Sequence, residues 1–173
     1  MPTADLVRRV LDLCRLRGAP QDLPWSPALL ALLIVAGTGL DVLTGAVLHD
    51  ADNAFARSLL SSATVLVLCW IALAIRHLRN RYVQTATALL ACSLAFSLLQ
   101  LPIALLAGPP PAGADALTGL QILVGWATLA VFVWQVSVDA HIMRHAMEAP
   151  FGLAFALVVS WVLAYWALDR MLF

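Results

Sequence analysis

Five long apolar runs dominate the pattern of hydrophobic and polar positions along the chain, and only short links separate them. About 20 apolar residues in a helix are needed to cross a hydrocarbon core of roughly 30 Å, so each run predicts one transmembrane helix. The predicted spans are Pro27 to Leu48, Arg57 to Arg76, Tyr82 to Ala107, Ala116 to Val138 and Phe151 to Leu168. The sequence therefore predicts an all-α, polytopic membrane helix bundle with five transmembrane helices in residues 27–173.

A shorter segment before the first run, Ala4 to Arg17, has helical rather than continuous apolar spacing. Its charged positions fall on one face, and its other face carries Leu6, Val7, Val10, Leu13 and Cys14. This predicts an N-terminal amphipathic helix that rests in the membrane interface, or packs on a partner or on the protein's own cytoplasmic surface. We expect an interaction face formed by Leu6, Val7, Val10, Leu13 and Trp25.

The segment after this helix is rich in residues that end helices. Gly18 favours a helix stop, and Pro20, Pro24 and Pro27 prevent the helix from continuing. Trp25 stands just before the first span, where an indole prefers the headgroup level. Residues 1–26 are therefore predicted to form a cytoplasmic amphipathic helix and a proline-rich elbow.

Composition supports a membrane location. The chain is 62% hydrophobic and 12% charged, whereas soluble domains are about 45–50% apolar and 25% charged. A net charge of zero without a basic stripe argues against a nucleic-acid partner. The cysteines are far apart and form no CxxC pair, so they are expected to be packing residues; they are Cys14, Cys69 and Cys92.

The cationic residues orient the predicted bundle. All are arginines, which together with the alanine, glycine and proline usage is typical of GC-rich, bacterial coding sequences. One side of the membrane receives Arg8, Arg9, Arg15, Arg17, Arg76, Arg79, Arg81 and Arg144, and the other receives Arg57 and Arg170. By the positive-inside rule, the N-terminus is predicted on the cytoplasmic side of a bacterial inner membrane and the C-terminus on the periplasmic side.

Polar side chains inside the spans are candidate functional groups, because they are costly in a bilayer. Counting from the span ends places several at one level, as a buried polar belt of Asp41, Ser61, Ser62, Gln100 and Gln121. One interpretation is a small polar cavity in which Asp41 is protonated or binds a cation or a headgroup. The other is a set of structural hydrogen bonds between helices, each contributing about 0.6–2 kcal/mol.

A second polar stripe follows the fourth span and suits a seam between helices. It consists of Gln121, Gly125, Thr128, Gln135 and Asp139 and continues into His141 and His145. With His77, these histidines are weak candidates for a metal or haem site on the cytoplasmic side; the segment lacks the HExxH pattern, and a solvated cluster is expected instead. No cofactor is expected. The absence of a GxSxG or Walker motif predicts a protein that is not an enzyme.

A cytoplasmic N-terminal segment followed by five closely spaced helices resembles the Yip1-type family of membrane proteins. The stretch LRGAPQDLPWSP, from Leu16 to Pro27, resembles the start of small bacterial members of that build. The tyrosine- and glycine-bearing motif of eukaryotic members is missing, so their role in vesicle traffic is not implied. The resemblance implies a five-helix bundle without an established catalytic centre.

Three functions follow as hypotheses. The first is an accessory or scaffold protein that binds other membrane proteins, or itself, within the lipid bilayer. The second is a small lipid- or ion-handling protein that uses the polar belt around Asp41. The third is a haem-binding electron carrier.

Overall fold

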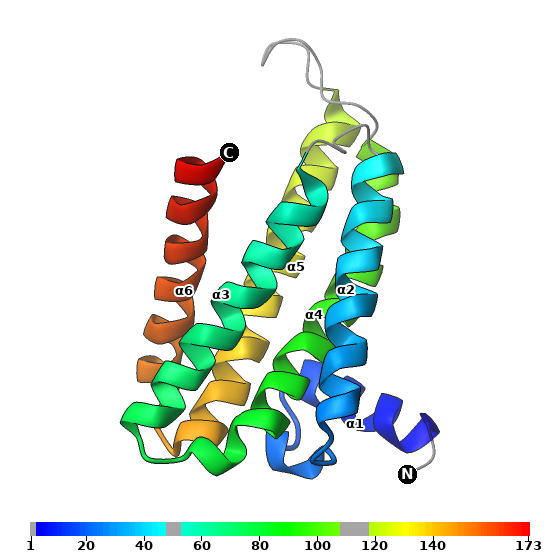
Figure 1. The fold of residues 1–173 in the computed structure, drawn as a ribbon. Helices are drawn as coiled ribbons and strands as arrows, with labels where there is room; N and C mark the ends of the chain where they lie inside the picture. The colour runs from blue at the N-terminus through cyan, green and yellow to red at the C-terminus, as the bar shows by residue number, and fades with distance from the viewer. Residues whose placement is uncertain (1–2, 48–52, 108–117) are drawn as a thin grey trace.

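The computed structural model describes residues 3–47, 53–107 and 118–173, and the regular secondary structure in these ranges is helical. A short helix precedes five long ones (Figure 1). They are α1 (Thr3–Cys14), α2 (Pro27–Val47), α3 (Ala54–Ile75), α4 (Tyr82–Ala107), α5 (Gly119–Met147) and α6 (Phe151–Leu172). Two 3₁₀ turns, η1 (Pro20–Asp22) and η2 (Arg79–Arg81), precede α2 and α4. The predicted all-α class is confirmed.

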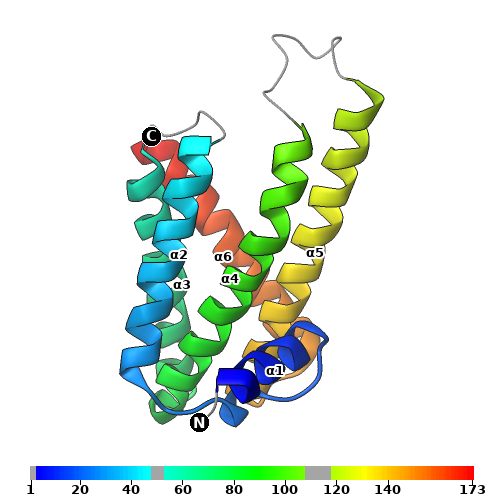
Figure 2. The same ribbon diagram turned by 90° about the vertical axis from the view of Figure 1, so that its right-hand side faces the viewer.

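The five long helices form a ring. Going round it, α2 packs on α3, α3 on α6, α6 on α5, α5 on α4, and α4 on α2 (Figures 1 and 2). Each helix is long and apolar enough to cross a membrane. The structure thus supports a multi-pass membrane protein, as the apolar runs predict. Two of the predicted limits, Leu48 and Ala116, lie outside the described residues.

The fifth helix is longer than its apolar run. The predicted span ends at Val138, whereas α5 continues to Met147. Asp139, Arg144 and the histidines are polar but compatible with a helix, so the loss of hydropathy marks a change of environment and not the helix end. The helix stops where Glu148 adopts a left-handed conformation (φ 53°), two residues before Pro150.

Helix α1 lies across α4 and α5 near one end of the ring (Figure 2). Leu13 and Cys14 are buried there, and Leu6 and Val10 pack against the core. The Trp134 indole donates a hydrogen bond to the Cys14 carbonyl oxygen at 2.8 Å. Of the alternatives open for this segment, the structure therefore has α1 docked on the protein's own helices. We call this end of the bundle the α1 end.

The elbow after α1 is also packed against the bundle. Its fully buried anchors are Pro20 and Leu23. The Gln84 side chain donates to the Leu23 carbonyl at 2.8 Å, and His141 Nε2 donates to the Gly18 carbonyl at 3.0 Å. Gly18 has a φ of 82°, and a Cβ there would lie 3.2 Å from an Asp22 carboxylate oxygen, so the chain reverses at the residue that tolerates this backbone best.

Two arginines of the link between α3 and α4 hold the end of α5. Arg76 donates to the Met147 carbonyl oxygen from Nε at 3.3 Å and from Nη2 at 3.2 Å. Arg81 pairs with the Glu148 carboxylate at 2.5 Å. The last carbonyls of a helix have no partner within the helix and carry partial negative charge. These arginines therefore provide hydrogen-bond and ion-pair partners for the C-terminal end of α5 and join it to the α3–α4 link.

The tightest packing is concentrated in the half of the bundle that carries α1. Residues with almost no exposed surface there come from α1, α3, α4 and α5 and include Leu13, Cys69, Leu73, Cys92, Ile142 and Met143. All three cysteines are buried free thiols, and the Cys92 thiol, by hydrogen bonding to Cys14, lowers the pKa of the Cys14 thiol. The α1 end is thus filled by packed, buried side chains.

Candidate functional site: a polar cavity inside the helix ring

The centre of the ring encloses a cavity of about 260 Å³ to which all five long helices contribute. Half of its lining is apolar, for example Leu89 and Trp161. The rest is polar and consists of Asp41, Ser61, Ser62, Thr64, Ser93, Ser97, Gln135, Asp139 and Tyr165. Polar groups gathered inside a membrane bundle face one another and not the lipid, which is the arrangement expected of a binding site or a solute path.

Helical spacing explains why these side chains converge. Residues four apart lie on one face of a helix, and the lining repeats this interval on three helices. The pairs are Gly37 and Asp41 on α2, Ser93 and Ser97 on α4, and Gln135 and Asp139 on α5. The inward faces of these three helices therefore produce much of a polar interior within helices that are otherwise apolar.

Asp41 lies in the part of the cavity that is nearer the end of the bundle opposite α1. Its Oδ2 accepts a hydrogen bond of 2.6 Å from the Ser58 hydroxyl of α3. Asp41 also lines a second hollow, of about 340 Å³, nearer the end of the bundle opposite α1. The two hollows share Asp41, Ser61 and Tyr165. Asp41 therefore stands where an outer vestibule meets the central cavity.

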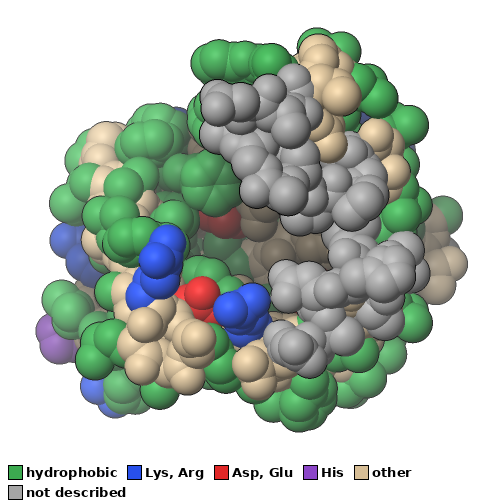
Figure 3. Space-filling view, turned by 90° about the horizontal axis from the view of Figure 1, so that it is seen from above, with side chains coloured by type: hydrophobic (Ala, Val, Ile, Leu, Met, Phe, Trp, Pro, Cys, Tyr) green, Lys and Arg blue, Asp and Glu red, His purple; other side chains and the backbone are tan. Residues whose placement is uncertain are grey.

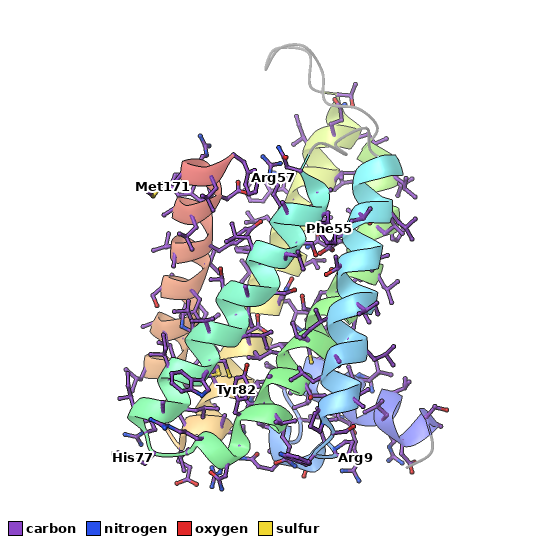
Figure 4. The ribbon with its side chains drawn as sticks, in the orientation of Figure 1. Arg9, Phe55, Arg57, His77, Tyr82 and Met171 are labelled. Atoms are coloured by element: carbon purple, nitrogen blue, oxygen red, sulfur yellow. The ribbon has the colours of Figure 1, made fainter. Side chains whose placement is uncertain are left out.

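The vestibule is visible from the end opposite α1. Figure 3 shows a hollow in the middle of this end, with an acidic side chain deep inside it. At the rim, Arg57 Nε of α3 lies 3.3 Å from Asp169 Oδ1 of α6. Figure 4 places Arg57 at this end of the bundle, near α6. The ion pair joins α3 to α6 at the rim of the vestibule. The carboxylate of Asp41 lies deeper, between the vestibule and the central cavity.

Asp139 marks the deep end of the cavity. It lies about two turns before the end of α5 at Met147, and its partly accessible surface faces the cavity it lines. Within the described ranges no hydrogen bond or ion pair reaches its carboxylate. Towards the α1 end, α5 continues with the fully buried core residues Ile142 and Met143, about one turn further along. The cavity therefore ends at a carboxyl group that has no hydrogen-bond or ion-pair partner among the described residues.

The structure brings together part of the predicted polar belt. Asp41, Ser61 and Ser62 line the cavity, whereas Gln100 and Gln121 are absent from the lining. Gln121 instead forms a capping box with Thr118 at the start of α5: its backbone N–H lies 3.3 Å from the Thr118 hydroxyl, and its side chain accepts from the Thr118 N–H at 3.0 Å. Depth alone placed these residues at one level, but depth does not fix the direction in which a side chain points.

Several cavity residues were not among the predicted site residues. The sequence predicts Gln135 and Asp139 as part of a seam between helices, and it does not single out Ser93, Ser97 or Tyr165, all of which line the cavity. The available signal was the four-residue spacing of polar residues within single apolar spans. That spacing identifies polar residues that share one helix face, whatever their depth in the membrane. Depth is a poor guide here because the cavity is elongated along the bundle axis.

The histidines lie outside the cavity. The sequence predicts His141 in a solvated cluster, but the side chain is buried, with 7% of its surface exposed. Its ring Nε2 forms a hydrogen bond with the Gly18 carbonyl oxygen. Its ring centroid is 4.6 Å from that of His145 one turn further along α5, and His77 is exposed in the turn after α3. Across the described part of the chain, no group of three or more His, Cys, Asp or Glu side chains is arranged to hold a metal ion.

The predicted interaction face is divided by the docking of α1. Leu13 is 2% exposed, and Leu6 and Val10 contact the protein's own core. Val7 and Trp25 remain exposed. While α1 stays docked, only Val7 and Trp25 of this face offer a large apolar surface to lipid or to another protein.

The hydrogen bond between Ser58 and Asp41 has a testable contribution to stability. We expect Ser58→Ala to lower the free energy of unfolding by about 0.6–2 kcal/mol, the range for hydrogen bonds between membrane helices. The matched control is Ser160→Ala, because the exposed Ser160 hydroxyl donates only to Leu157 of its own helix; a change within about 0.5 kcal/mol is expected there. Thermal unfolding in detergent measures both variants, and equal effects would show that the bond does not join α2 to α3.

The described helices support a multi-pass helical membrane protein with a polar interior that adjoins a second hollow nearer the end opposite α1. Comparisons of the chain with protein-family models, with curated proteins and with solved structures find no match. The resemblance to the Yip1-type family stays a prediction.

Proposed function

We propose that the protein binds a small hard cation, an alkali or alkaline-earth ion, in the cavity between Asp41 and Asp139. The observation that carries this proposal is that two aspartate side chains from different helices line one cavity in a membrane bundle. A charge in such an environment is costly unless it is paired. A bound cation, or a proton that competes with it, supplies the missing partner.

The chemistry of the lining favours a hard cation over other ligands. Its polar atoms come from carboxylate, hydroxyl, phenol and amide groups, and no histidine or cysteine lines the cavity. Oxygen ligands suit alkali and alkaline-earth ions, whereas transition metals favour nitrogen and sulfur. A volume of about 260 Å³ corresponds to roughly eight water molecules. The cavity therefore fits an ion that keeps part of its hydration shell.

Access from one side supports a site that exchanges with one compartment. The vestibule lies towards the end opposite α1 and includes Asp41, and buried core residues such as Ile142 and Met143 follow Asp139 towards the α1 end. The arginine distribution supports a cytoplasmic α1 end, with eight arginines there and two at the other end. On this assignment the cavity opens to the outer side of a bacterial inner membrane.

Cation binding should stabilise the folded protein by mass action. At a concentration one hundred times the dissociation constant, a ligand specific for the folded state adds about 2.7 kcal/mol to the free energy of unfolding. We expect the melting temperature in detergent to rise with sodium, potassium or calcium. N-methyl-D-glucamine at matched ionic strength should not raise it. The same melting temperature in all salts at equal ionic strength would argue against the proposal.

The other functions predicted from the sequence gain less support. An accessory role relied on Leu6, Val10 and Leu13 as a partner surface, and these residues contact the protein's own helices. A haem-carrier role relied on histidines that lie outside the cavity. Both stay predictions, and neither is needed to explain a polar interior.

A further inference from the structure

An apolar crevice runs along the outside of the bundle, separate from the central polar cavity. It has a volume of about 270 Å³ and is lined by residues of α1, α2 and α4. Its walls include Leu6 and Val10 of α1, Leu33 of α2, and Ala91, Ala95 and Leu98 of α4. The small side chains of Ala91 and Ala95 leave room between the larger ones. The crevice follows α4 from Thr87 to Leu98, a length of about 16 Å.

A cationic hollow adjoins the crevice on the same helix. It is shallow and is lined by Arg8, Arg15 and Arg17, with Asp12 as the acidic member. Val7 and Leu11 line both the crevice and this hollow, and both are exposed apolar side chains, 57% and 45% accessible. Among the described residues no ion pair engages Arg8 or Arg15. An apolar slot and a surface of net positive charge are therefore continuous across α1.

We propose that this surface binds an anionic phospholipid from the leaflet at the α1 end, with an acyl chain in the crevice and the phosphate at Arg8 and Arg15. The chemistry matches on both sides: the slot offers apolar walls along a membrane-spanning helix, and arginine binds phosphate oxygens through a fork of N–H donors. The position of α1 across the side of α4 (Figure 2) puts these arginines near the end of the bundle, where lipid headgroups lie.

The bound lipid would have a structural consequence for α1. Leu6 and Val10 line the crevice while they also pack against the protein core, so an acyl chain fills the space between α1 and α4. The lipid would then hold the first half of α1 on the bundle, as Leu13 and Cys14 hold its second half. This inference does not depend on the cation site, because the two hollows share only Leu33 and Leu94.

Native mass spectrometry of the detergent-solubilised full chain tests this proposal with phosphatidylglycerol and phosphatidylcholine of identical acyl chains. We expect wild-type protein to retain phosphatidylglycerol at least about fivefold better, and the Arg8→Gln/Arg15→Gln variant to lose that preference. The matched control, Arg79→Gln/Arg144→Gln, removes the same amount of charge from exposed positions at the same end. This control should keep the preference for phosphatidylglycerol. Equal retention of both lipids by wild type, or an equal loss in the control, would overturn the assignment.

The crevice itself is tested with Ala95→Phe, which fills the slot from a half-buried position. Retention of both lipids should fall, because the acyl chain loses its place. Unchanged retention in a variant with a normal melting temperature would refute the crevice as the acyl-chain site. If Ala95→Phe disturbs folding, the arginine variants still decide the headgroup site, because their substitutions are on exposed side chains.

Discussion

The Asp139→Asn variant is expected to bind the stabilising cation about 10- to 100-fold more weakly than wild type while it folds normally. Asparagine keeps the size and hydrogen-bonding capacity of the side chain but removes its charge. An ionised ligand 4 Å from a cation contributes about 4 kcal/mol at an effective dielectric constant of 20, before desolvation is subtracted. A net loss of about 1.4–2.8 kcal/mol corresponds to the stated range.

The measurement is the dependence of the melting temperature on cation concentration. Asp5→Asn is the matched control, because Asp5 is an exposed carboxylate on α1 outside the cavity; its titration should coincide with that of wild type. Asp41→Asn should weaken binding less than Asp139→Asn, since the Ser58 hydroxyl already satisfies one Asp41 oxygen. An Asp139→Asn titration identical to wild type would remove Asp139 from the site.

The Leu13→Ala variant is expected to lose about 2–5 kcal/mol of folding free energy, the usual cost of truncating a buried leucine. Leu13 is 2% exposed and belongs to the core that joins α1 to the bundle. Leu11→Ala is the matched control, because it removes the same atoms from the same helix at a position that is 45% exposed. We expect its effect to stay within about 0.5 kcal/mol.

Unfolding by heat in detergent compares these two leucine variants, and Trp134 provides a local readout. Its indole bonds to the Cys14 carbonyl oxygen, so partial release of α1 should shift the tryptophan emission in Leu13→Ala and leave it unchanged in Leu11→Ala. Similar small losses in both variants would mean that α1 is not part of the folded core. That result would return α1 to the role of a surface for other proteins.

The number and extent of the long helices were predictable because membrane thickness sets a length that apolar runs must meet. The run from Tyr82 to Ala107 matches α4 at both ends. The prediction for α5 stopped at Val138, nine residues before Met147. Hydropathy reports where a helix meets lipid, whereas Asp139 and His141 lie inside protein, so the polar part of α5 carried no signal of its helical state.

The cavity was predictable only in part, since the spans are apolar on nearly every face and their rotation is not fixed by periodicity. Asp41 is the single charged residue in the predicted first span, and the structure places it in the cavity lining. Gln100 was predicted in the polar belt from its depth but does not line the cavity. Asp139 was not predicted there, yet the packing of the helices places it in the cavity lining. Which polar stripes turn inward depends on contacts around the ring, and these are long-range in sequence.

The docking of α1 illustrates the same limit. The apolar face was evident from the spacing of Leu6, Val10 and Leu13, but a face of that kind fits lipid, a partner or the protein's own helices equally well. The hydrogen bonds that hold α1 and the elbow on the bundle join residues 61 to 124 positions apart: Trp134 bonds to Cys14 of α1, and Gln84, His141 and the His145 carbonyl bond to the elbow. Local pattern predicted the helix, and tertiary contacts determined its partner.

The measurement that tests the cation site most directly is an experimental structure of the wild-type protein with rubidium or strontium, chosen according to whether the melting-temperature series favours monovalent or divalent ions. We predict an anomalous scattering peak inside the helix ring between Asp41 and Asp139, and its loss in Asp139→Asn. Anomalous peaks confined to the outer surface, at ion concentrations that stabilise the protein, would contradict the proposal that this cavity is a cation site.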